Sequence, residues 1–520
     1  MNKILKYGCL VPMFFLAACS DFLEPKSQSE YVPTLVKSLD ELLLGEAYMG
    51  PGSGEDGRLY GVLGLLDDDV ATRGNVEEYD PYYETKLHEV ELFFSWSQRL
   101  KEEYDSYNTY GEVYKKIVGC NAVLDYVDDS EGTEDAKNLV KAQALALRGY
   151  YYFHLVNLYA KPYYVGRNEL GVPLQLSSEL STSSKARNTV GEVYDQILAD
   201  LREAERLYTL LPDSEWSLKN NRINLPCIQL LLSRVYLYME NWQEALAYGE
   251  KVINDYSFEL KDLNTVEAPS PYGSPSYIPY YTWENPEVIF LFGNEADVVT
   301  LPLSSINMTI YDKYGNPNYK SISVCVVSND LINSYEENDL RKSRYLIWER
   351  ISSGSETPQY RVPVSKYEVG TYYGMSYGWE AGSWGVAFKV TEAYLNVAEA
   401  DAMLYKESGD AQNQTKAINL LERLREKRFA SSSPDYKVTV TDPDGLVSFV
   451  RTERRRELCF ENHRWFDLRH YGMEGMKRVW NYGSDAIEYV LEKDDPRYTL
   501  LIPNEAFELN SALIQNELKN

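Results

Sequence analysis

The chain has 520 residues and a formal net charge of −27, and its length leaves room for one large domain or several smaller ones. The negative charge repels nucleic acid, heparin-like polymers and anionic lipid, so we expect no nucleic-acid partner. Tyrosine is unusually frequent, with 45 residues against 15 phenylalanines, and a ring with a polar tip suits half-wet surfaces and binding faces.

The first 19 residues have the pattern of a lipoprotein signal. Lys3 and Lys6 precede an apolar stretch over residues 7–18, which is too short to span a bilayer as a stable helix. The stretch ends in Leu-Ala-Ala before Cys19, a lipobox whose cysteine can take diacylglycerol on its sulfur. A plain signal peptide with a chance cysteine is the alternative. We predict a signal peptide over 1–18 and a mature chain that is lipid-anchored at Cys19 without crossing the membrane.

Long helical patterns follow along most of the chain. They are predicted over residues 35–48, 110–128, 134–159, 190–210, 225–238, 242–254, 391–406, 411–429 and 445–461. Between roughly 260 and 390 the chain becomes rich in Pro, Gly, Tyr and Trp, with short β-like runs such as VIFLFG and ISVCVV. We interpret this part as long loops and small sheets inserted into a helical frame.

The helix pairs look repeated. Residues 231–253 place a small residue at Ser233, aromatic residues at Tyr236 and Trp242, and a second small residue at Ala245. This spacing is typical of tetratricopeptide repeats, in which small residues lie where two helices touch. Generic antiparallel helices are the alternative. The predicted fold is mainly α, a scaffold of tetratricopeptide-like helix pairs at about 110–255 and 391–472 with loop and short-strand insertions at about 50–100 and 260–390.

Two aromatic, loop-rich regions could bind a ligand. Sugar rings have flat C–H faces between hydroxyl groups, so a site needs aromatic platforms beside carboxylates, amides or arginines. The first region brings together Arg73, Asn75, Tyr82, Tyr83 and Trp96. The second, residues 371–385, places Tyr372, Tyr373, Tyr377, Trp379 and Trp384 among glycines.

Each of these predictions has an alternative. Tyr280, Tyr281 and Trp283 form a third, weaker ligand candidate. For every aromatic residue named, plain packing of a loop against the scaffold is the competing interpretation. Asp67, Asp68 and Asp69 precede the first region and could instead chelate Ca²⁺. We otherwise expect no metal.

Residues 454–472, RRRELCFENHRWFDLRHYG, form the most unusual stretch. Glu453, Glu457 and Glu461 recur every four residues, so on a helix they share a face and need cations opposite them. Arg456 and Arg464 are near enough in sequence to supply some. We predict a partly buried ion network that pins the last helices to the body.

Catalytic and metal patterns are weak. His463 and His470 are seven residues apart, which is not the spacing of a helical zinc pair. The string over residues 52–57 fits G-x-G-x-x-G, but it follows a helical pattern and contains two acidic residues, so we interpret it as a loop. There is no P-loop and no G-x-S-x-G elbow. The cysteines at 120, 227, 325 and 459 are too widely spaced for a disulfide or zinc framework, and we expect them to be buried. We predict no cofactor.

Four stretches together resemble the SusD/RagB family. They are CSDFL at 19–23, LRGYYYFHLVNLY at 147–159, the 454–472 block and LIPNEAFELNSALIQN at 501–516. The resemblance covers the mature chain and implies one SusD-like domain over 19–520. It implies a surface nutrient-binding lipoprotein of the outer membrane that is not an enzyme.

The resemblance also implies partners. Such proteins cap a TonB-dependent, SusC-like β-barrel transporter and hold an oligosaccharide or a peptide, often with contacts from the N-terminal region. Capture of oligosaccharides is therefore the leading expectation. The same assembly carrying peptides is the second, and a lipid-anchored glycoside hydrolase is the third.

Overall fold

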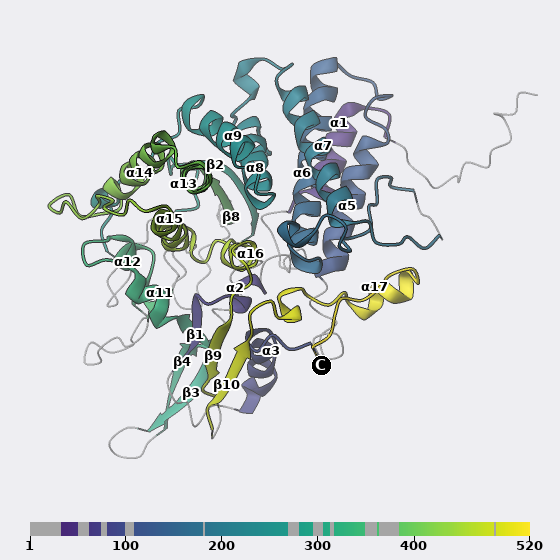
Figure 1. Ribbon diagram of the computed structural model, residues 1–520. Coiled ribbons are helices and arrows are strands. Elements are labelled where there is room, and N and C mark those ends of the chain that lie inside the picture. Colours follow the sequence, from purple (N-terminus) through teal and green to yellow (C-terminus); the bar gives the residue numbers. More distant parts are fainter. Residues whose placement is uncertain are drawn as a thin grey trace, which may run out of the picture.

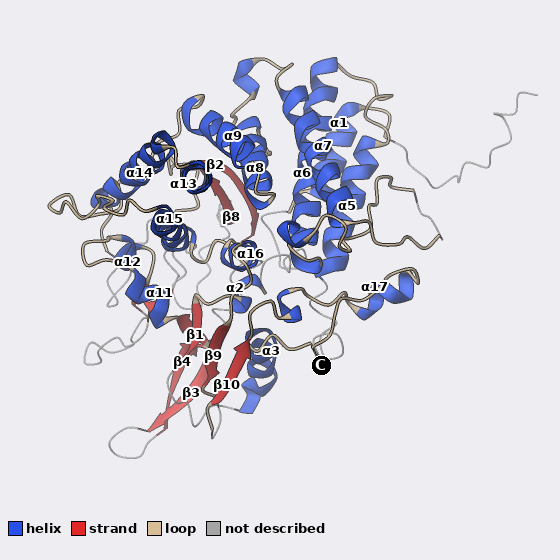
Figure 2. Cartoon of the chain, in the orientation of Figure 1, coloured by secondary structure: helices blue, strands red, loops and turns tan. Residues whose placement is uncertain are grey.

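The structure is a computed structural model that describes residues 33–49, 62–73, 81–98, 109–179, 183–268, 280–294, 305–311, 317–348, 361–362, 384–482 and 485–519. The predicted signal peptide and the lipidation residue Cys19 lie outside these residues. Helices form most of the described fold, and the strands gather at its centre and at one end (Figure 2).

The N-terminal half is a row of helices, each packed on the next in chain order from α5 to α9 (Figure 1). It contains α1 (Val36–Leu42), the π-turn η2 (Leu43–Ala47), α5 (Thr109–Leu124), α6 (Glu134–Tyr159), α7 (Val190–Tyr208), α8 (Leu225–Tyr238) and α9 (Trp242–Asn254). Local sequence starts these helices: Thr189 and Glu192 form a capping box for α7, and Asn224 caps α8.

The row continues into the C-terminal half. It comprises α13 (Val390–Ser408), α14 (Ala411–Glu426), α15 (Pro443–Leu458) and α16 (Arg464–His470). Helix α13 packs against α9, α14 and α15. A Cβ added at Gly249 of α9 would lie 2.5 Å from Cγ2 of Val397, so glycine is needed for this close contact. The predicted small contact residue Ser233 is confirmed, since its Oγ donates to the carbonyl of Ala245 at 2.7 Å.

The predicted helices are present, with ends shifted by a few residues. Helix α15 ends at Leu458, three residues before the predicted end. Phe460 and Asn462 take the left-handed conformation, with φ of 60° and 64°, which a right-handed helix cannot contain. Glu461 therefore lies beyond the helix and does not share the helical face of Glu453 and Glu457.

The described strands form two-stranded antiparallel sheets. The pairs are β1 (Val70–Thr72) with β5 (Cys325–Val327), β2 (Val288–Asn294) with β8 (Trp384–Lys389), β3 (Ser305–Tyr311) with β4 (Pro317–Ser323), β6 (Ile347–Trp348) with β7 (Arg361–Val362), and β9 (Met476–Trp480) with β10 (Ile487–Leu491). The predicted β-runs VIFLFG and ISVCVV correspond to β2 and to β4–β5.

Strands β1, β3, β4, β9 and β10 lie together at one end of the molecule beside α3 (Glu84–Phe94), and we call this end the strand layer (Figure 1). Strand β1 contacts β9 as well as β5, so segments from three distant parts of the sequence meet there. Shorter elements complete the described fold: α2 (Leu63–Leu66), α11 (Asn329–Ser334), α12 (Arg341–Arg344), α17 (Asn504–Leu509), and the turns Pro81–Tyr83, Tyr163–Val165, Asp213–Glu215, Leu263–Thr265 and Pro496–Tyr498.

The core runs through both halves. Tyr151 and Tyr152 of α6 are fully buried, and the Tyr152 hydroxyl donates to the carbonyl of Gln175 at 2.6 Å. The four cysteines at 120, 227, 325 and 459 are free and buried, as predicted. In the part of the chain that the structure describes, we find no helix with the length and apolar content that a membrane span requires.

Arg187 holds the C-terminal tail against the end of α6. Arg187 donates to the backbone carbonyls of Tyr159, Gly171 and Ile514 and to the side chain of Asn516, at 2.6 to 2.9 Å. Asn516 in turn donates to the Tyr159 carbonyl at 2.9 Å. The tail stretch 501–516 is therefore tied to the end of α6 by several directional bonds.

Candidate functional site

A groove of ≈ 930 Å³ lies at the strand layer. Pockets of this size hold small ligands when apolar walls carry a few polar groups. The walls come from β1, β5, β6, β7, β9, the end of α3 and the start of α11. The lining includes Asp68, Thr72, Phe94, Val326, Asn329, Asp330, Trp348, Arg361, Met476, Lys477, Arg478 and Asn481.

Side-chain hydrogen bonds hold β1 in place along this groove. The Thr72 hydroxyl donates to the Val479 carbonyl at 2.8 Å, and Asn481 donates to Thr72 Oγ1 at 3.2 Å and to the Arg73 carbonyl at 2.9 Å. Arg73 Nε donates to the Ser323 carbonyl at 2.7 Å. The groove wall is therefore built by contacts between residues about 250 to 400 positions apart.

The acidic run before β1 lies beneath the groove and is bound by arginines. Arg464 makes a bidentate contact with Asp68 at 2.6 and 2.8 Å, and Arg455 contacts Asp69 at 2.7 Å. Burial alone would raise the pKa of Asp68, but the hydrogen bonds and charge of Arg464, with the charge of Arg455, lower it to about 2. Arg455 also contacts Asp330 on the groove wall at 2.5 Å, so it links the floor to the wall.

This pairing bears on the calcium alternative. Asp68 and Asp69 direct oxygens at guanidinium groups, and burial with the charges of its two neighbours raises the pKa of Asp67 well above its ordinary value. A calcium site needs several ionised, outward-directed oxygens. Within the described ranges, no group of three or more acidic, histidine or cysteine side chains is arranged to hold a metal ion.

Trp348 and Arg361 form the aromatic part of the groove. The guanidinium carbon of Arg361 lies 4.1 Å from the centre of the Trp348 ring, and 36% of Trp348 is exposed. The two residues are paired across β6 and β7, because Trp348 lies opposite Arg361 in the register. An exposed indole beside polar groups is a suitable surface for the C–H face of a sugar.

A second hollow, more polar and of ≈ 590 Å³, adjoins the groove at Asp330. Its wall comes from α11, α13, α15 and α16 and includes Lys406, Asp444, Arg451 and Thr452. Lys406 and Asp444 are paired at 2.8 Å, and Arg451 contacts Glu399 at 3.0 Å. The described residues of its lining include no aromatic ring, so this lining offers hydrogen bonds without a stacking surface.

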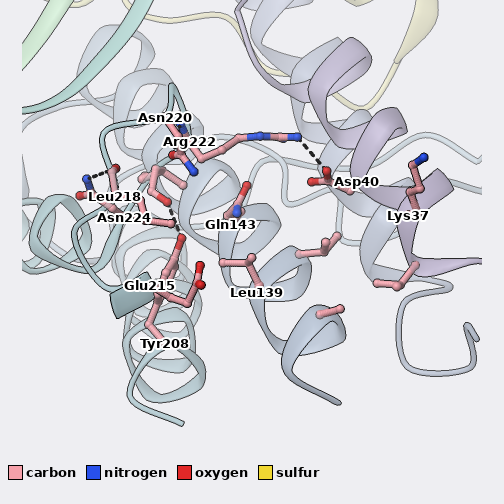
Figure 3. Close-up of a pocket in the computed structure, with 14 residues that line it drawn as sticks. Lys37, Asp40, Leu139, Gln143, Tyr208, Glu215, Leu218, Asn220, Arg222 and Asn224 are labelled. Carbon is pink, nitrogen blue, oxygen red and sulfur yellow. Dashed lines mark hydrogen bonds and ion pairs between the residues drawn. The ribbon is translucent and has the colours of Figure 1, made fainter. Parts of the chain in front are cut away.

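A third, smaller cavity of ≈ 300 Å³ lies between α1, α6 and the segment before α8 (Figure 3). The Arg222 side chain crosses its upper edge to Asp40, with 2.8 Å between Nη2 and Oδ2. Tyr208 and Gln143 point into the same region in Figure 3, but Tyr208 donates to the Ile223 carbonyl and Gln143 accepts from Tyr48. Tyr208 and Gln143 already have partners, and the larger groove in addition carries the exposed Trp348 ring, so the larger groove is the better ligand site.

The 454–472 block is scaffold, and the predicted ion network is confirmed. We call the α15 ion cluster the buried set of five cations and five carboxylates formed by Arg341, Arg425, Arg428, Arg456, Lys389, Asp339, Glu287, Glu453, Glu457 and Glu461.

The source of the cations differs from the expectation. Arg456 does pair with Glu453, at 2.5 Å, but Arg464 binds Asp68 beneath the groove. Glu453 and Glu457 receive most of their positive charge from Arg341, Arg425 and Arg428, which no short-range pattern links to them. Burial opposes ionisation, but Arg341, Arg425 and Arg456 lower the pKa of Glu453 to about 2.

His470 of the block is also structural. His470 is buried, and its ring stacks on Tyr238 with centroids 5.0 Å apart. Burial, with the charge of Arg451, lowers the pKa of His470 to about 3. The ring is therefore neutral at physiological pH, and its packing against Tyr238 accounts for its place in the block.

Several predicted ligand residues lie inside the core. Trp96 is 3% exposed, donates from Nε1 to the Leu66 carbonyl at 2.8 Å, and packs its ring 3.9 Å from the Arg478 guanidinium. Trp384 is buried in β8, and Tyr280 and Tyr281 are buried as well. Their rings are covered in this structure, so packing is the role that it gives them.

The other predicted ligand residues are dispersed. Tyr82 is 82% exposed and meets Tyr83 edge-on, with ring centroids 5.2 Å apart. Trp283 donates to Asn221 Oδ1 at 3.1 Å on another part of the molecule. Arg73 is buried beside the groove, next to its lining residue Thr72. Asn75, Tyr372, Tyr373, Tyr377 and Trp379 lie outside the described residues.

Sequence reasoning missed Trp348, Arg361, Asp330, Lys477 and Asn481. The available signal was weak: Trp348 sits in the short stretch LIWER, and Arg361 follows it thirteen positions later in QYRV. Neither stretch is long enough to show strand alternation. Their pairing becomes apparent only when β6 and β7 are seen together.

Comparisons with known proteins agree with this architecture. The profile of a family described as "Starch-binding associating with outer membrane" matches residues 21–237, and the profile described as "SusD family" matches residues 348–518. A SusD-like protein P2 of Formosa agariphila is 26% identical, with 76% of this chain and 79% of the relative aligned. SusD-like protein P25 of the same organism is 20% identical, with 100% and 99% aligned.

Solved structures show the same fold. A SusD-like carbohydrate binding protein from Bacteroides vulgatus superposes with a TM-score of 0.65 at 20% identity, covering 93% of this chain and 99% of that one. Surface glycan-binding protein A from Bacteroides uniformis gives a TM-score of 0.64 at 18% identity, covering 92% and 99%.

Proposed function

The chain belongs to the SusD/RagB family, and from this premise we propose that it is a non-catalytic cell-surface protein that captures oligosaccharides. We further propose that it delivers them to a partner SusC-like, TonB-dependent transporter of the outer membrane. In this proposal the mature chain, residues 19–520, acts as a single domain whose helical row is scaffold and whose strand layer holds the ligand.

The observation that carries the proposal is the groove with Trp348 on its wall. An exposed indole offers a flat apolar face for a sugar ring, while Asp330, Asn329, Lys477 and Asn481 surround it with hydrogen-bonding groups. This combination of one platform and a polar rim matches the alternating surface of a saccharide.

Ion pairs beneath the groove hold its wall in a fixed shape. Arg455 is bound to Asp69 below and to Asp330 on the wall, and Arg464 is bound to Asp68. These charge-assisted bonds hold the wall against α15, and through α15 to the α15 ion cluster. A preformed site loses less conformational entropy when it binds a flexible glycan.

The groove carboxylates support a non-catalytic role. A glycoside hydrolase needs a carboxylic acid with a raised pKa as its proton donor, opposite a second carboxylate. Of the two carboxylates that line the groove, Asp68 has a lowered pKa and a bidentate arginine, and Asp330 is paired with Arg455. Neither is arranged to protonate a glycosidic oxygen.

Membrane attachment is the second part of the proposal. The lipobox predicts an acyl anchor on Cys19, and acyl chains contribute about 0.8 kcal/mol per buried methylene. Cys19→Ala should leave the protein folded but released from the membrane fraction. Surface attachment that persists in this variant would contradict the anchor.

Affinity electrophoresis tests the binding function. The soluble chain from Ser20 onward is run through native gels that contain starch, xyloglucan, galactomannan, polygalacturonate, alginate or a sulfated galactan. We expect retardation in at least one gel and no release of reducing sugar from that polysaccharide. Release of reducing sugar would indicate a hydrolase, and binding confined to peptides in a parallel titration would replace the saccharide with a peptide cargo.

A further inference from the structure

Arg361 lines the groove, and its guanidinium group is held by backbone carbonyls and by the Trp348 ring. Its Nη1 donates to the backbone carbonyls of Lys342 at 2.8 Å and Leu346 at 2.7 Å. The guanidinium also stacks on Trp348, 4.1 Å from the ring centre. Two hydrogen bonds and one stacking contact therefore fix the plane and leave the edge formed by Nε and Nη2.

That edge has no partner among the described residues. Nε and Nη2 of Arg361 make no hydrogen bond or ion pair with a described residue. Neither atom is among the buried polar atoms without a partner, so both are accessible to solvent. Burial lowers the pKa of Arg361, with no carboxylate to offset it. An Nε–Nη2 edge carries two parallel N–H groups, which match the two oxygens of a carboxylate or sulfate.

Arg361 differs from the other charged residues of the groove. The described lining contains the cations Arg361, Lys477 and Arg478 and the carboxylates Asp68 and Asp330, and Lys477 is paired with Glu488 at 3.2 Å. Both carboxylates are already bound by arginines from α15 and α16. Arg361 therefore places a positive charge without a described counterion on this wall of a chain whose net charge is −27. A long polyanion is repelled by the whole molecule, whereas a short chain with few acidic groups meets mainly the local field.

We propose that the groove selects short saccharides that carry an anionic group, a carboxylate or a sulfate, which the Nε–Nη2 edge of Arg361 binds while a sugar ring contacts Trp348. This proposal rests on the proposed function and names its substrate class. Arg361 acts as a specificity-determining residue, since a neutral sugar leaves its charge without a counterion.

The test uses an array of tri- to hexasaccharides in neutral, uronate-bearing and sulfated forms, with acidic peptides on the same surface. The acidic saccharide that binds best is then titrated by calorimetry beside its neutral derivative, a methyl ester for a carboxylate or a desulfated form for a sulfate. Three variants are compared with the wild type: Arg361→Gln, Arg361→Lys and the control Lys493→Gln, which removes an exposed positive charge outside the groove lining.

We expect the wild type to bind the acidic form about 10- to 100-fold more tightly than the neutral derivative, as charge-assisted bidentate bonds do. Arg361→Gln should remove this preference and leave the affinity for the neutral form within about twofold. Arg361→Lys should lose most of the preference because an ammonium has no parallel N–H pair. Lys493→Gln should keep it. A uronate or a sulfate on the best ligand identifies which anion is recognised.

Each contrary result is distinguishable. Binding of neutral saccharides alone would overturn the proposal while the proposed function stands. Equal loss of acidic and neutral binding in Arg361→Gln would show that Arg361 only supports the wall, and would overturn it as well. Acidic peptides bound in place of saccharides, or no binding at all, would count against both the proposal and the proposed function.

Discussion

The α15 ion cluster and the groove at the strand layer use arginine in opposite ways. In the cluster, each guanidinium faces carboxylates at 2.5 to 3.3 Å and almost no solvent. In the groove, Arg361 is held by backbone carbonyls and an indole ring, and no described carboxylate neutralises it. A fully paired arginine supports the fold, whereas an arginine held in place without a counterion is available to bind a ligand.

The largest expected effect comes from unpairing the cluster. Arg341 contacts Asp339, Glu453 and Glu457 and is fully buried. Arg341→Met should lower the free energy of unfolding by about 3–5 kcal/mol, because it leaves buried carboxylates without a cation. Urea denaturation followed by circular dichroism measures this. The matched control is Arg206→Met, which breaks the exposed pair with Glu203 and should change little. Equal effects of the two variants would contradict the contrast.

Substitution of Trp96 should give the next largest effect, and it distinguishes a core residue from a ligand-binding residue. In the core, its Nε1 donates to the Leu66 carbonyl and its ring packs against the Arg478 guanidinium. Trp96→Ala should cost about 3–5 kcal/mol of unfolding free energy through the cavity and the buried arginine that it leaves. If thermal stability were instead unchanged and glycan binding were lost, Trp96 would belong to the ligand site, as the sequence suggested.

Acid should weaken the α15 ion cluster, because Glu453 loses its charge as the pH falls. Burial opposes the charge of Glu453, but its cations lower the folded pKa from 4.5 to about 2. Ionised Glu453 therefore contributes stability that is fully present above about pH 4.5 and is lost as pH falls toward 2. Denaturation midpoints measured between pH 7 and 3 should show this loss, and Glu453→Gln should reduce the slope. A midpoint independent of pH below 4.5 would contradict the pairing.

Asp401 on α13 gives a smaller effect of the opposite sign. It is buried, and neither carboxylate oxygen has a hydrogen-bond partner within the described residues. Burial and the charge of Glu250 raise its pKa, against Lys416, to about 7. Stability should therefore fall as pH rises from about 4 to 7. Asp401→Asn should add roughly 1 to 3 kcal/mol at pH 8 and nothing at pH 4. An equal change at both pH values would show that ionisation is not the cause.

The helices and the ion network could be predicted from the sequence, because their signals are local. Thr189 and Asn224 mark helix starts, Ser233 and Ala245 mark a helix contact, and the spacing of Glu453 and Glu457 requires nearby cations. The end of α15 could not be predicted, since it depends on the left-handed conformation of Phe460.

The candidate site could not be predicted from local sequence patterns. Its walls join segments near residues 70, 326, 348, 361 and 478, and no periodicity connects them. Trp96 was predicted to bind the ligand because it lies in an aromatic, loop-rich region, but Arg478, 382 positions away, packs against its ring. Trp348 and Arg361 were missed because each lies in a strand of two residues.

The most direct test of the central claim is the glycan affinity of Trp348→Ala beside that of the wild type, measured in the native gel that retards the wild type. Trp348 is partly exposed on the groove wall. We therefore expect the variant to bind the glycan at least tenfold more weakly, with its thermal midpoint changed by no more than about 2 °C. Unchanged retardation in a folded Trp348→Ala protein would place the ligand elsewhere and contradict the account.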